Sequence, residues 1–211
     1  LEVRRARLSV KRFGMEVNMI KTTAILLDEL RQYANPKTKL SRMVRQGKYI
    51  HITKGLYETD KNTPPHLLAG SIYGPSYLSF EYALSCYGLI PEAVYTITCA
   101  TFEKKKKKRY ETPFGTFTYR DVPSDAFPLG LKVIREGEYF YRIAEPEKAL
   151  CDELYILPPA ANGKELISIL TEDLRVDPDG LLNLDAEKIM MLSDKYHSTN
   201  VRKLAALLRR M

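Results

Sequence analysis

The first 60 residues contain two short stretches of helical hydrophobic spacing followed by a β-rich segment. Apolar residues recur every three or four positions over 22–34 and again over 36–47. An Asn-Pro pair opens the second stretch and a glycine closes it, as is typical of a helix start and a helix end. Residues 49–58 then form two β-rich runs around a short turn. We therefore predict a small winged helix-turn-helix over residues 21–60.

A larger region follows the linker-like segment Thr59–Pro65. Its pattern mixes strand alternation with helical spacing, which predicts a mixed α/β domain over residues 66–211 with a helical C-terminal tail. The predicted fold class is α+β. The expected helices lie at 66–72 and 79–88, from Pro146 onward, and around 166–174, 189–196 and 201–208; the expected strands lie at 94–102, 114–120, 131–134 and 139–143.

Positive charge is concentrated near the N-terminus. The chain carries 33 Lys+Arg against 26 Asp+Glu, a net charge of +7. Residues 1–60 hold 13 basic and 6 acidic side chains, whereas residues 61–211 hold 20 of each. Part of the excess comes from a basic leader at 1–20, which is either an added segment or an extra helix of the first domain. This distribution indicates a polyanionic partner for the N-terminal region.

The second N-terminal helix is the strongest candidate for contact with nucleic acid. Its polar faces interleave basic side chains with hydroxyl and amide groups. Basic groups can bind phosphates and position a helix in the major groove, while hydroxyls and amides can read base edges. We expect phosphate contacts from Lys37, Lys39, Arg42, Arg45 and Lys48, base contacts from Thr38, Ser41 and Gln46, and a hairpin-tip contact from Lys54. An ordinary solvated helix face is the alternative.

A second basic cluster lies between two predicted strands. It consists of Lys104, Lys105, Lys106, Lys107, Lys108 and Arg109. We interpret it as the tip of a loop, because like charges repel each other and favour solvent. Both a solvated loop and a contact with nucleic acid or an acidic partner are consistent with this pattern.

The sequence gives no sign of a membrane or secreted protein. No stretch approaches the roughly 18 apolar residues of a membrane helix, and the N-terminus has no apolar signal region. The three cysteines, Cys86, Cys99 and Cys151, fit neither a disulfide framework nor a metal-binding pair, so we expect them to be reduced and buried. The expected location is the cytoplasm.

Motifs of the common enzyme classes do not occur in the chain. There is no Walker A loop, GxGxxG, HExxH or GxSxG. Carboxylates between Glu145 and Glu153, together with Lys148, could hold Mg²⁺ in a nuclease, but those at the helix start also suit the helix dipole. We expect no enzymatic activity, no cofactor and no metal. A Mg²⁺-dependent nuclease built on Glu147 and Asp152 is a remote alternative.

Three strings of residues resemble the AbiEi antitoxin family. They run from Leu40 to Tyr57, from Tyr77 to Leu89 and from Tyr141 to Asp152. The third string reads Arg-Ile-Ala-x-Pro-Glu-Lys-Ala-Leu-x-Asp from Arg142 and is the most specific of the three. The resemblance extends over about residues 22–210.

The resemblance implies a component of a bacterial toxin–antitoxin system of the abortive-infection type. The winged helix would bind and repress the promoter of its own operon, with a homodimer on DNA as one arrangement. The second domain would counteract a nucleotidyltransferase-like toxin. The signature residues Arg142, Glu147, Lys148 and Asp152 would support the fold or contact the partner. A protein-interaction antitoxin without specific DNA binding is the alternative.

The chain departs from the family pattern at two places. The family's first domain usually has two helices before the recognition helix, whereas only the helix over 22–34 is clear here. A further helix would have to come from residues 1–20. Phe80 and Tyr82 stand where smaller or more polar residues are common, and we expect this difference to alter packing only.

Overall fold

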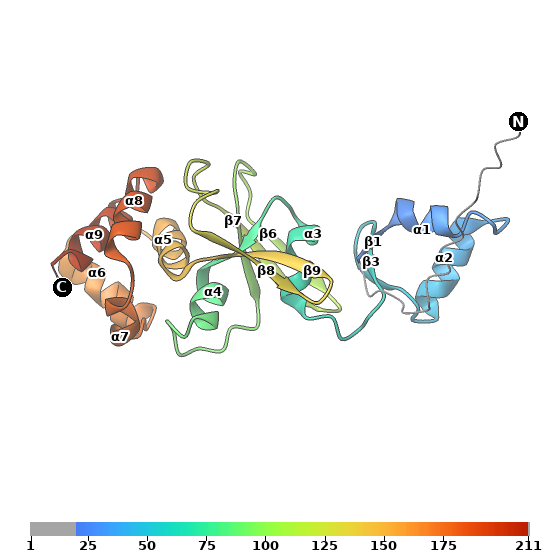
Figure 1. The fold of residues 1–211 in the computed structure, drawn as a ribbon, viewed down its shortest axis with the longest axis horizontal. Coiled ribbons are helices and arrows are strands. Elements are labelled where there is room, and N and C mark those ends of the chain that lie inside the picture. The colour runs from blue at the N-terminus through green and yellow to red at the C-terminus, as the bar shows by residue number, and fades with distance from the viewer. Residues whose placement is uncertain (1–19, 211) are drawn as a thin grey trace, which may run out of the picture.

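The protein consists of a small N-terminal domain, a central sheet and a C-terminal group of helices, arranged in that order along the molecule (Figure 1). The computed structural model describes residues 20–210. The predicted α+β fold class is confirmed. All but the last residue of the basic leader at 1–20 lies outside the described residues, and so does any extra helix that it would supply.

The N-terminal domain combines two helices with a three-stranded antiparallel sheet of order β1-β3-β2. Leu26, Leu30 and Leu40 form its small core. The Asn35 side chain accepts a hydrogen bond from the Thr38 amide at 3.1 Å, so the predicted cap is present. The elements are β1 (Lys21–Thr22), α1 (Thr23–Glu29), α2 (Pro36–Arg45), β2 (Ile50–Thr53) and β3 (Leu56–Glu58).

The β2–β3 hairpin connects the N-terminal domain to the rest of the protein. Ile52 and Leu56 are buried in the main core and not in the small one. Glu58 is fully buried, and its Oε2 accepts a hydrogen bond from the Tyr139 hydroxyl at 2.7 Å. Burial, with this hydrogen bond as the next cause, raises the pKa of Tyr139. The hairpin therefore packs against the central region through both apolar and polar contacts.

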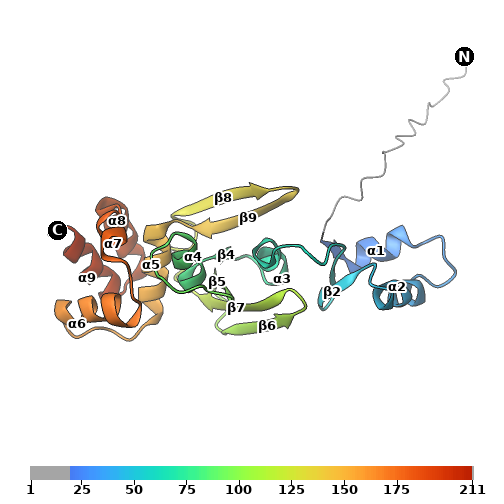
Figure 2. The same ribbon diagram turned by 90° about the horizontal axis from the view of Figure 1, so that it is seen from below.

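The central sheet has six strands in the order β6-β7-β5-β4-β9-β8 (Figure 2). The pairs β5–β7 and β4–β9 are parallel and the others are antiparallel. Every residue of β5 is buried, whereas β6 and β8 form the exposed edges. The strands are β4 (Tyr77–Leu78), β5 (Ile97–Thr101), β6 (Lys108–Thr112), β7 (Gly115–Asp121), β8 (Leu131–Glu136) and β9 (Tyr139–Ala144).

The structure corrects the prediction that Lys104–Arg109 is entirely a loop tip. Lys108 and Arg109 begin the edge strand β6, where they pair with Tyr119 and Thr118 of β7. An edge strand tolerates charged side chains because water and not another strand lies beyond it. Backbone pairing with β7 therefore places these two residues in a strand, although a run of like charges favours a solvated loop.

The helices that follow the N-terminal domain begin beside the central sheet and continue into a C-terminal group. α5 lies between the sheet and that group, and residues 147–154 are all buried. α7 was not predicted. The helices are η1 (Pro65–Leu68), α3 (Ala69–Ile72), α4 (Phe80–Cys86), α5 (Pro146–Ile156), α6 (Gly163–Ser168), the π-helical turn η2 (Ile169–Asp173), α7 (Pro178–Leu182), α8 (Ala186–Tyr196) and α9 (Thr199–Leu208).

The three cysteines differ in exposure. Cys99 and Cys151 are free and buried as expected, but Cys86 is exposed at the end of α4, so the prediction of its burial is wrong. Between residues 20 and 210, none of the helices has the length and apolar character needed to cross a membrane.

Gly130 lies in a close approach that can be tested by mutation. Its φ is +62°, and a Cβ there would lie 2.9 Å from the Lys148 Cβ. Gly130→Ala should therefore be less stable than Gly137→Ala, because Gly137 has a similar φ of +59° but open space around it. We expect a loss of about 1 kcal/mol at Gly137 from backbone strain and about 3 kcal/mol at Gly130. Urea unfolding measures both, and equal losses would contradict the close approach.

Candidate functional site

The outer face of α2 is the candidate DNA-binding surface. Leu40 is buried, and Met43 and Val44 are half-buried against the small core. Because each helical residue advances by about 100°, Thr38 and Arg42 project from the opposite side. Arg45 projects from the same side, and all three are exposed. The predicted apolar stripe therefore fixes which side of α2 is free to bind.

One flank of this face borders the hairpin. Lys37, Ser41 and Arg45 line a shallow groove of about 490 Å³ together with His51 and Tyr57. The Ser41 hydroxyl donates to the Lys37 carbonyl at 3.1 Å. Its proton is therefore already engaged, and the oxygen retains only its acceptor capacity toward a base. Of the predicted base contacts, Ser41 can therefore make only those in which its hydroxyl oxygen accepts a hydrogen bond.

The positive charge of α2 is not neutralised within the described residues. The helix contains no acidic residue, and the Lys39 ammonium lies over the Tyr33 ring at 4.5 Å. Gln46 is exposed where the helix ends. Among residues 20–210, no carboxylate pairs with Lys37, Arg42, Arg45, Lys48 or Lys54. These groups are free to bind phosphates.

The hairpin tip has a defined position relative to the helices. Gly55 adopts φ +78°, which the turn requires, and its carbonyl accepts a hydrogen bond from the Thr23 amide at 2.9 Å. This bond joins the tip to the start of α1. Lys54 is exposed at the tip. A wing contact from Lys54 therefore needs no rearrangement of the turn.

The second basic cluster belongs to the central domain. Lys104 donates to the Gly74 carbonyl at 3.1 Å, and its ammonium lies 5.3 Å from the centroid of the Tyr73 ring. The Lys105 amide donates to Asp121 at 2.6 Å. The side chains of Lys105, Lys106 and Lys107 are exposed, and Arg109 pairs with Glu111 at 3.2 Å. The first part of the cluster is thus a tethered loop.

The strand side of this cluster lines a groove of about 820 Å³. Lys107, Lys108 and Arg109 contribute basic groups, and Glu92 and Asp173 contribute acidic groups. The groove thus carries both signs of charge. Because carboxylates disfavour a phosphate backbone, the groove supports nucleic-acid binding less well than α2 does.

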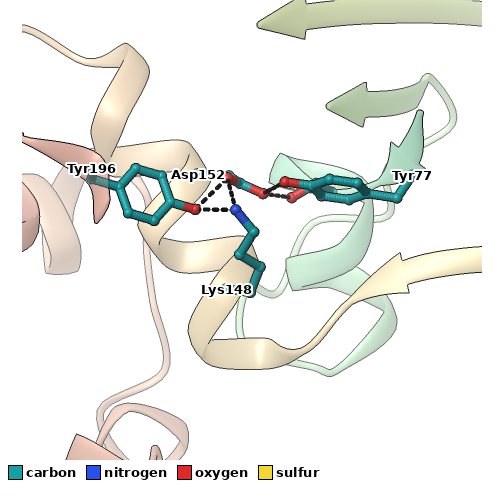
Figure 3. A network of polar contacts seen from close by, with 5 residues as sticks. Tyr77, Lys148, Asp152 and Tyr196 are labelled. Atoms are coloured by element: carbon teal, nitrogen blue, oxygen red, sulfur yellow. Dashed lines mark hydrogen bonds and ion pairs between the residues drawn. The ribbon is translucent and has the colours of Figure 1, made fainter. Parts of the chain in front are cut away.

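The signature residues of α5 form a buried polar network (Figure 3). Lys148 and Asp152 are fully buried and form an ion pair, with Nζ and Oδ1 2.9 Å apart. Tyr196 contacts both members of the pair. On the other side, the Tyr77 and Ser79 hydroxyls donate to Asp152 Oδ2 at 3.0 and 2.6 Å. Both carboxylate oxygens of Asp152 are therefore hydrogen-bonded.

The burial of this network indicates that it stabilises the fold. Burial, followed by the Asp152 charge, raises the pKa values of Tyr77 and Tyr196 well above the ordinary value, so both hydroxyls remain donors. Glu147 is also buried and accepts a hydrogen bond from the Asp185 amide at 3.1 Å. Burial favours a structural role for Glu147, Lys148 and Asp152 over direct contact with a partner. Of the four signature residues, only Arg142 is exposed.

The geometry does not favour the metal-nuclease alternative. Asp152 has no exposed oxygen to offer a cation, and its nearest charged neighbour is the Lys148 ammonium. Within residues 20–210, no group of three or more His, Cys, Asp or Glu side chains is arranged to hold a metal ion. Mg²⁺ normally binds through one or two accessible carboxylates and several waters, which this interior does not offer.

Sequence reasoning missed most of the network. The spacing of Lys148 and Asp152, four residues apart on a helix, is a signal for their pairing. Tyr77, Ser79 and Tyr196 lie 44 to 75 residues away from Asp152 in the chain, and no local pattern connects them to it. Ser79 directly precedes α4, but its hydroxyl binds Asp152 and makes no capping bond.

Glu153 is a second buried acid beside the network. It is 3% exposed, and its Oε2 has no hydrogen-bond partner. Burial is the largest cause that raises its pKa to about 7, and the Glu81 carboxylate adds to this effect. Arg120, which pairs with Glu81, acts in the opposite direction. Glu153 is therefore protonated below neutral pH in the folded protein.

Loss of the Lys148 ammonium should destabilise the protein strongly. Lys148→Met leaves Asp152 buried without its cation, and we expect a loss of about 3–5 kcal/mol in unfolding free energy. Lys188→Met is the matched control, because Lys188 pairs with Glu145 at the surface and should cost less than about 1 kcal/mol. Chemical denaturation compares the two variants, and a loss below 1 kcal/mol at Lys148 would contradict the importance of the ion pair.

Glu153→Gln should remove part of the pH dependence of stability. The folded protein holds the proton to about pH 7, whereas the unfolded chain releases it near pH 4.5. The folded state therefore binds more protons in this window, and stability falls as the pH rises through it, by on the order of 3 kcal/mol. Glu153→Gln should be more stable than the wild type at pH 8 and equally stable at pH 4.

Urea midpoints at the two pH values measure this difference. Glu103→Gln is the control, since Glu103 is exposed, and it should show no pH-dependent gain. A gain for Glu153→Gln that is equal at pH 4 and pH 8 would show that the pKa of Glu153 is not raised.

Comparison with known proteins identifies a similar fold but no family. No family model matches the chain, and no curated protein matches its sequence. The chain is similar to the crystal structure of the RV2827C protein from Mycobacterium tuberculosis, with a TM-score of 0.58 and 14% sequence identity. The match covers 90% of this chain and 70% of that chain. The similarity therefore extends over both the N-terminal domain and the central sheet with its helices, and it concerns the fold alone.

Proposed function

We propose that this protein is a DNA-binding transcriptional autoregulator and the antitoxin of a bacterial toxin–antitoxin pair. The observation that carries the DNA-binding part is the outer face of α2, where exposed basic side chains have no carboxylate partner among residues 20–210. The hairpin beside it presents Lys54. A helix with this charge distribution, flanked by a basic wing, suits the phosphate backbone and the major groove of duplex DNA.

Specific reading of DNA in this proposal depends on a few side chains. Thr38 lies at the centre of the exposed face and its hydroxyl is available as donor and acceptor. Gln46 lies at the helix end with an amide that can bind adenine. Arg42 and Arg45 lie between them, where bidentate contacts to phosphate or guanine are within the chemistry of a guanidinium.

The antitoxin part of the proposal rests on the AbiEi resemblance of the signature string. The string spans the end of β9 and the first part of α5, and the buried network of α5 connects this helix to β4, to Ser79 directly before α4, and to α8. A partner of this domain would be a nucleotidyltransferase-like toxin. A reading frame for such a protein beside this gene would favour the proposal, including its alternative form, an interaction module that does not read DNA.

The DNA-binding proposal predicts a salt-dependent and sequence-dependent interaction. The protein should bind a duplex from its own upstream region more tightly than a scrambled duplex. Replacing Arg42 and Arg45 with alanine should weaken binding to both and lower the slope of log affinity against log salt by about two units, one for each lost phosphate contact. Fluorescence anisotropy at several salt concentrations measures the affinities and the slope.

The matched control removes two arginines at the other end of the molecule. Arg202 and Arg210 are exposed in the C-terminal helical region, so the double alanine variant changes the net charge equally. This control should keep nearly the wild-type slope. Equal slopes for the two double variants would exclude α2 from the interface, and equal affinity for both duplexes would exclude sequence-specific reading.

A further inference from the structure

A small cleft separate from α2 lies between α3, β4 and the β8–β9 hairpin. Its volume is about 320 Å³, which is at the lower end of the size range of small-molecule sites. Its walls include Leu67 and Leu78 from the interior and Val133 and Phe140 from the hairpin. Val133 and Phe140 are 68% and 66% exposed, so apolar surface meets solvent at this cleft.

Arg142 places a positive charge in the same cleft. It lies two residues after Phe140 on β9 and opposite Val133 on β8, so the three side chains share one face of the hairpin. Arg142 is exposed, and no hydrogen bond or ion pair connects its guanidinium to another side chain in residues 20–210. It is also the one signature residue that is exposed.

Ser76 provides a second polar group in the cleft wall. It is 3% exposed, and its Oγ has no hydrogen-bond partner within the described protein. Buried hydroxyls normally have a partner, because an unmade hydrogen bond is costly away from water. Ser71, exposed at the same wall, adds a further hydroxyl. The cleft thus combines unused polar groups with an apolar surface.

The charge balance of the cleft favours a ligand with a single negative charge. His66 is the other ionisable cation-forming group in the wall, and its Nε2 is already held by the Glu136 carboxylate at 2.9 Å. Within the described part of the chain, residues 20–210, no aspartate or glutamate lines the cleft. One guanidinium, with hydroxyls in the wall of the same cleft, matches the two oxygens of a carboxylate, whereas a phosphate dianion would leave a charge unpaired.

We propose that this cleft binds a carboxylate attached to an apolar group, with Arg142 binding the carboxylate, Ser76 and Ser71 adding hydrogen bonds, and Val133 and Phe140 covering the apolar part. The carboxylate belongs either to a free organic acid or to the C-terminal residue of a polypeptide. This site does not depend on DNA binding by α2.

Titration with phenylacetate, followed by amide chemical shifts in NMR spectra, tests the proposal. Shifts should be concentrated at residues 67–71, 76–78 and 140–142, with saturation at millimolar concentration, about 20 mM at most. Phenylacetamide has the same shape without the charge and should bind at least about tenfold more weakly. No saturable shift with either phenylacetate or isovalerate up to that concentration would overturn the proposal.

Two arginine variants test whether Arg142 itself binds the carboxylate or whether any exposed arginine attracts it. Arg142→Gln should weaken phenylacetate binding by about tenfold or more. Arg202→Gln should leave it unchanged, because Arg202 is exposed on α9 and does not line the cleft. Ser76→Ala should weaken binding by a smaller factor. Equal binding by the wild type and Arg142→Gln would overturn the proposal, as would displacement of phenylacetate by an equal concentration of inorganic phosphate.

A peptide probe distinguishes the two sources of the carboxylate. The dipeptide Gly-Phe with a free C-terminus is compared with its C-terminal amide. Tighter binding of the free dipeptide than of phenylacetate supports a polypeptide C-terminus as the ligand. Binding of phenylacetate without binding of the dipeptide supports a free organic acid. Equal binding of the dipeptide and its amide, at the phenylacetate level, would overturn the assignment of a carboxylate.

Discussion

The buried ion pair between Lys148 and Asp152 is the interaction on which the central domain depends most. Two unlike charges without access to water are stable together only when their remaining hydrogen-bonding capacity is used. Tyr196 comes from α8, and Tyr77 and Ser79 come from β4 and the start of α4. The need to solvate one carboxylate therefore brings the sheet, α5 and the C-terminal helices into a fixed arrangement.

The same principle operates where the N-terminal domain meets the sheet. Glu58 is fully buried at the end of β3 and is held by the Tyr139 hydroxyl and by the amides of Thr59 and Asp60. Ile52 and Leu56 add apolar contacts beside it. The hairpin that carries Lys54 is therefore anchored at its base, and α2 inherits a defined orientation from the small core that it shares with α1.

The sequence was sufficient to predict the elements whose signals are local. The Asn35 cap, Pro36 and the Leu40 stripe fixed α2 to within two residues of its observed end. β6 was missed because its strand character comes from pairing with β7, and a run of lysines gives no alternation of its own. The partners of Asp152 were missed for the related reason that a hydrogen bond between distant segments has no periodic signature.

The candidate DNA-binding face of α2 could be predicted from the sequence, whereas the cleft at Arg142 could not. Charge counting identified α2, because an uncompensated basic helix is visible in the sequence itself. The cleft at Arg142 was not visible, since it depends on three segments meeting: α3, β4 and the β8–β9 hairpin. The orphan hydroxyl of Ser76 is likewise a property of the packed state, and a lone serine beside a proline predicts only a turn.

The two exposed edges of the central sheet have a consequence for association between chains. An unpaired strand edge offers backbone donors and acceptors to any other extended chain, which is a common route to aggregation. β6 begins with Lys108 and Arg109, and β8 carries Lys132 and Arg135. Two copies approaching edge to edge would bring these cations together. Repulsion between these cations therefore disfavours extension of the sheet into a neighbouring molecule.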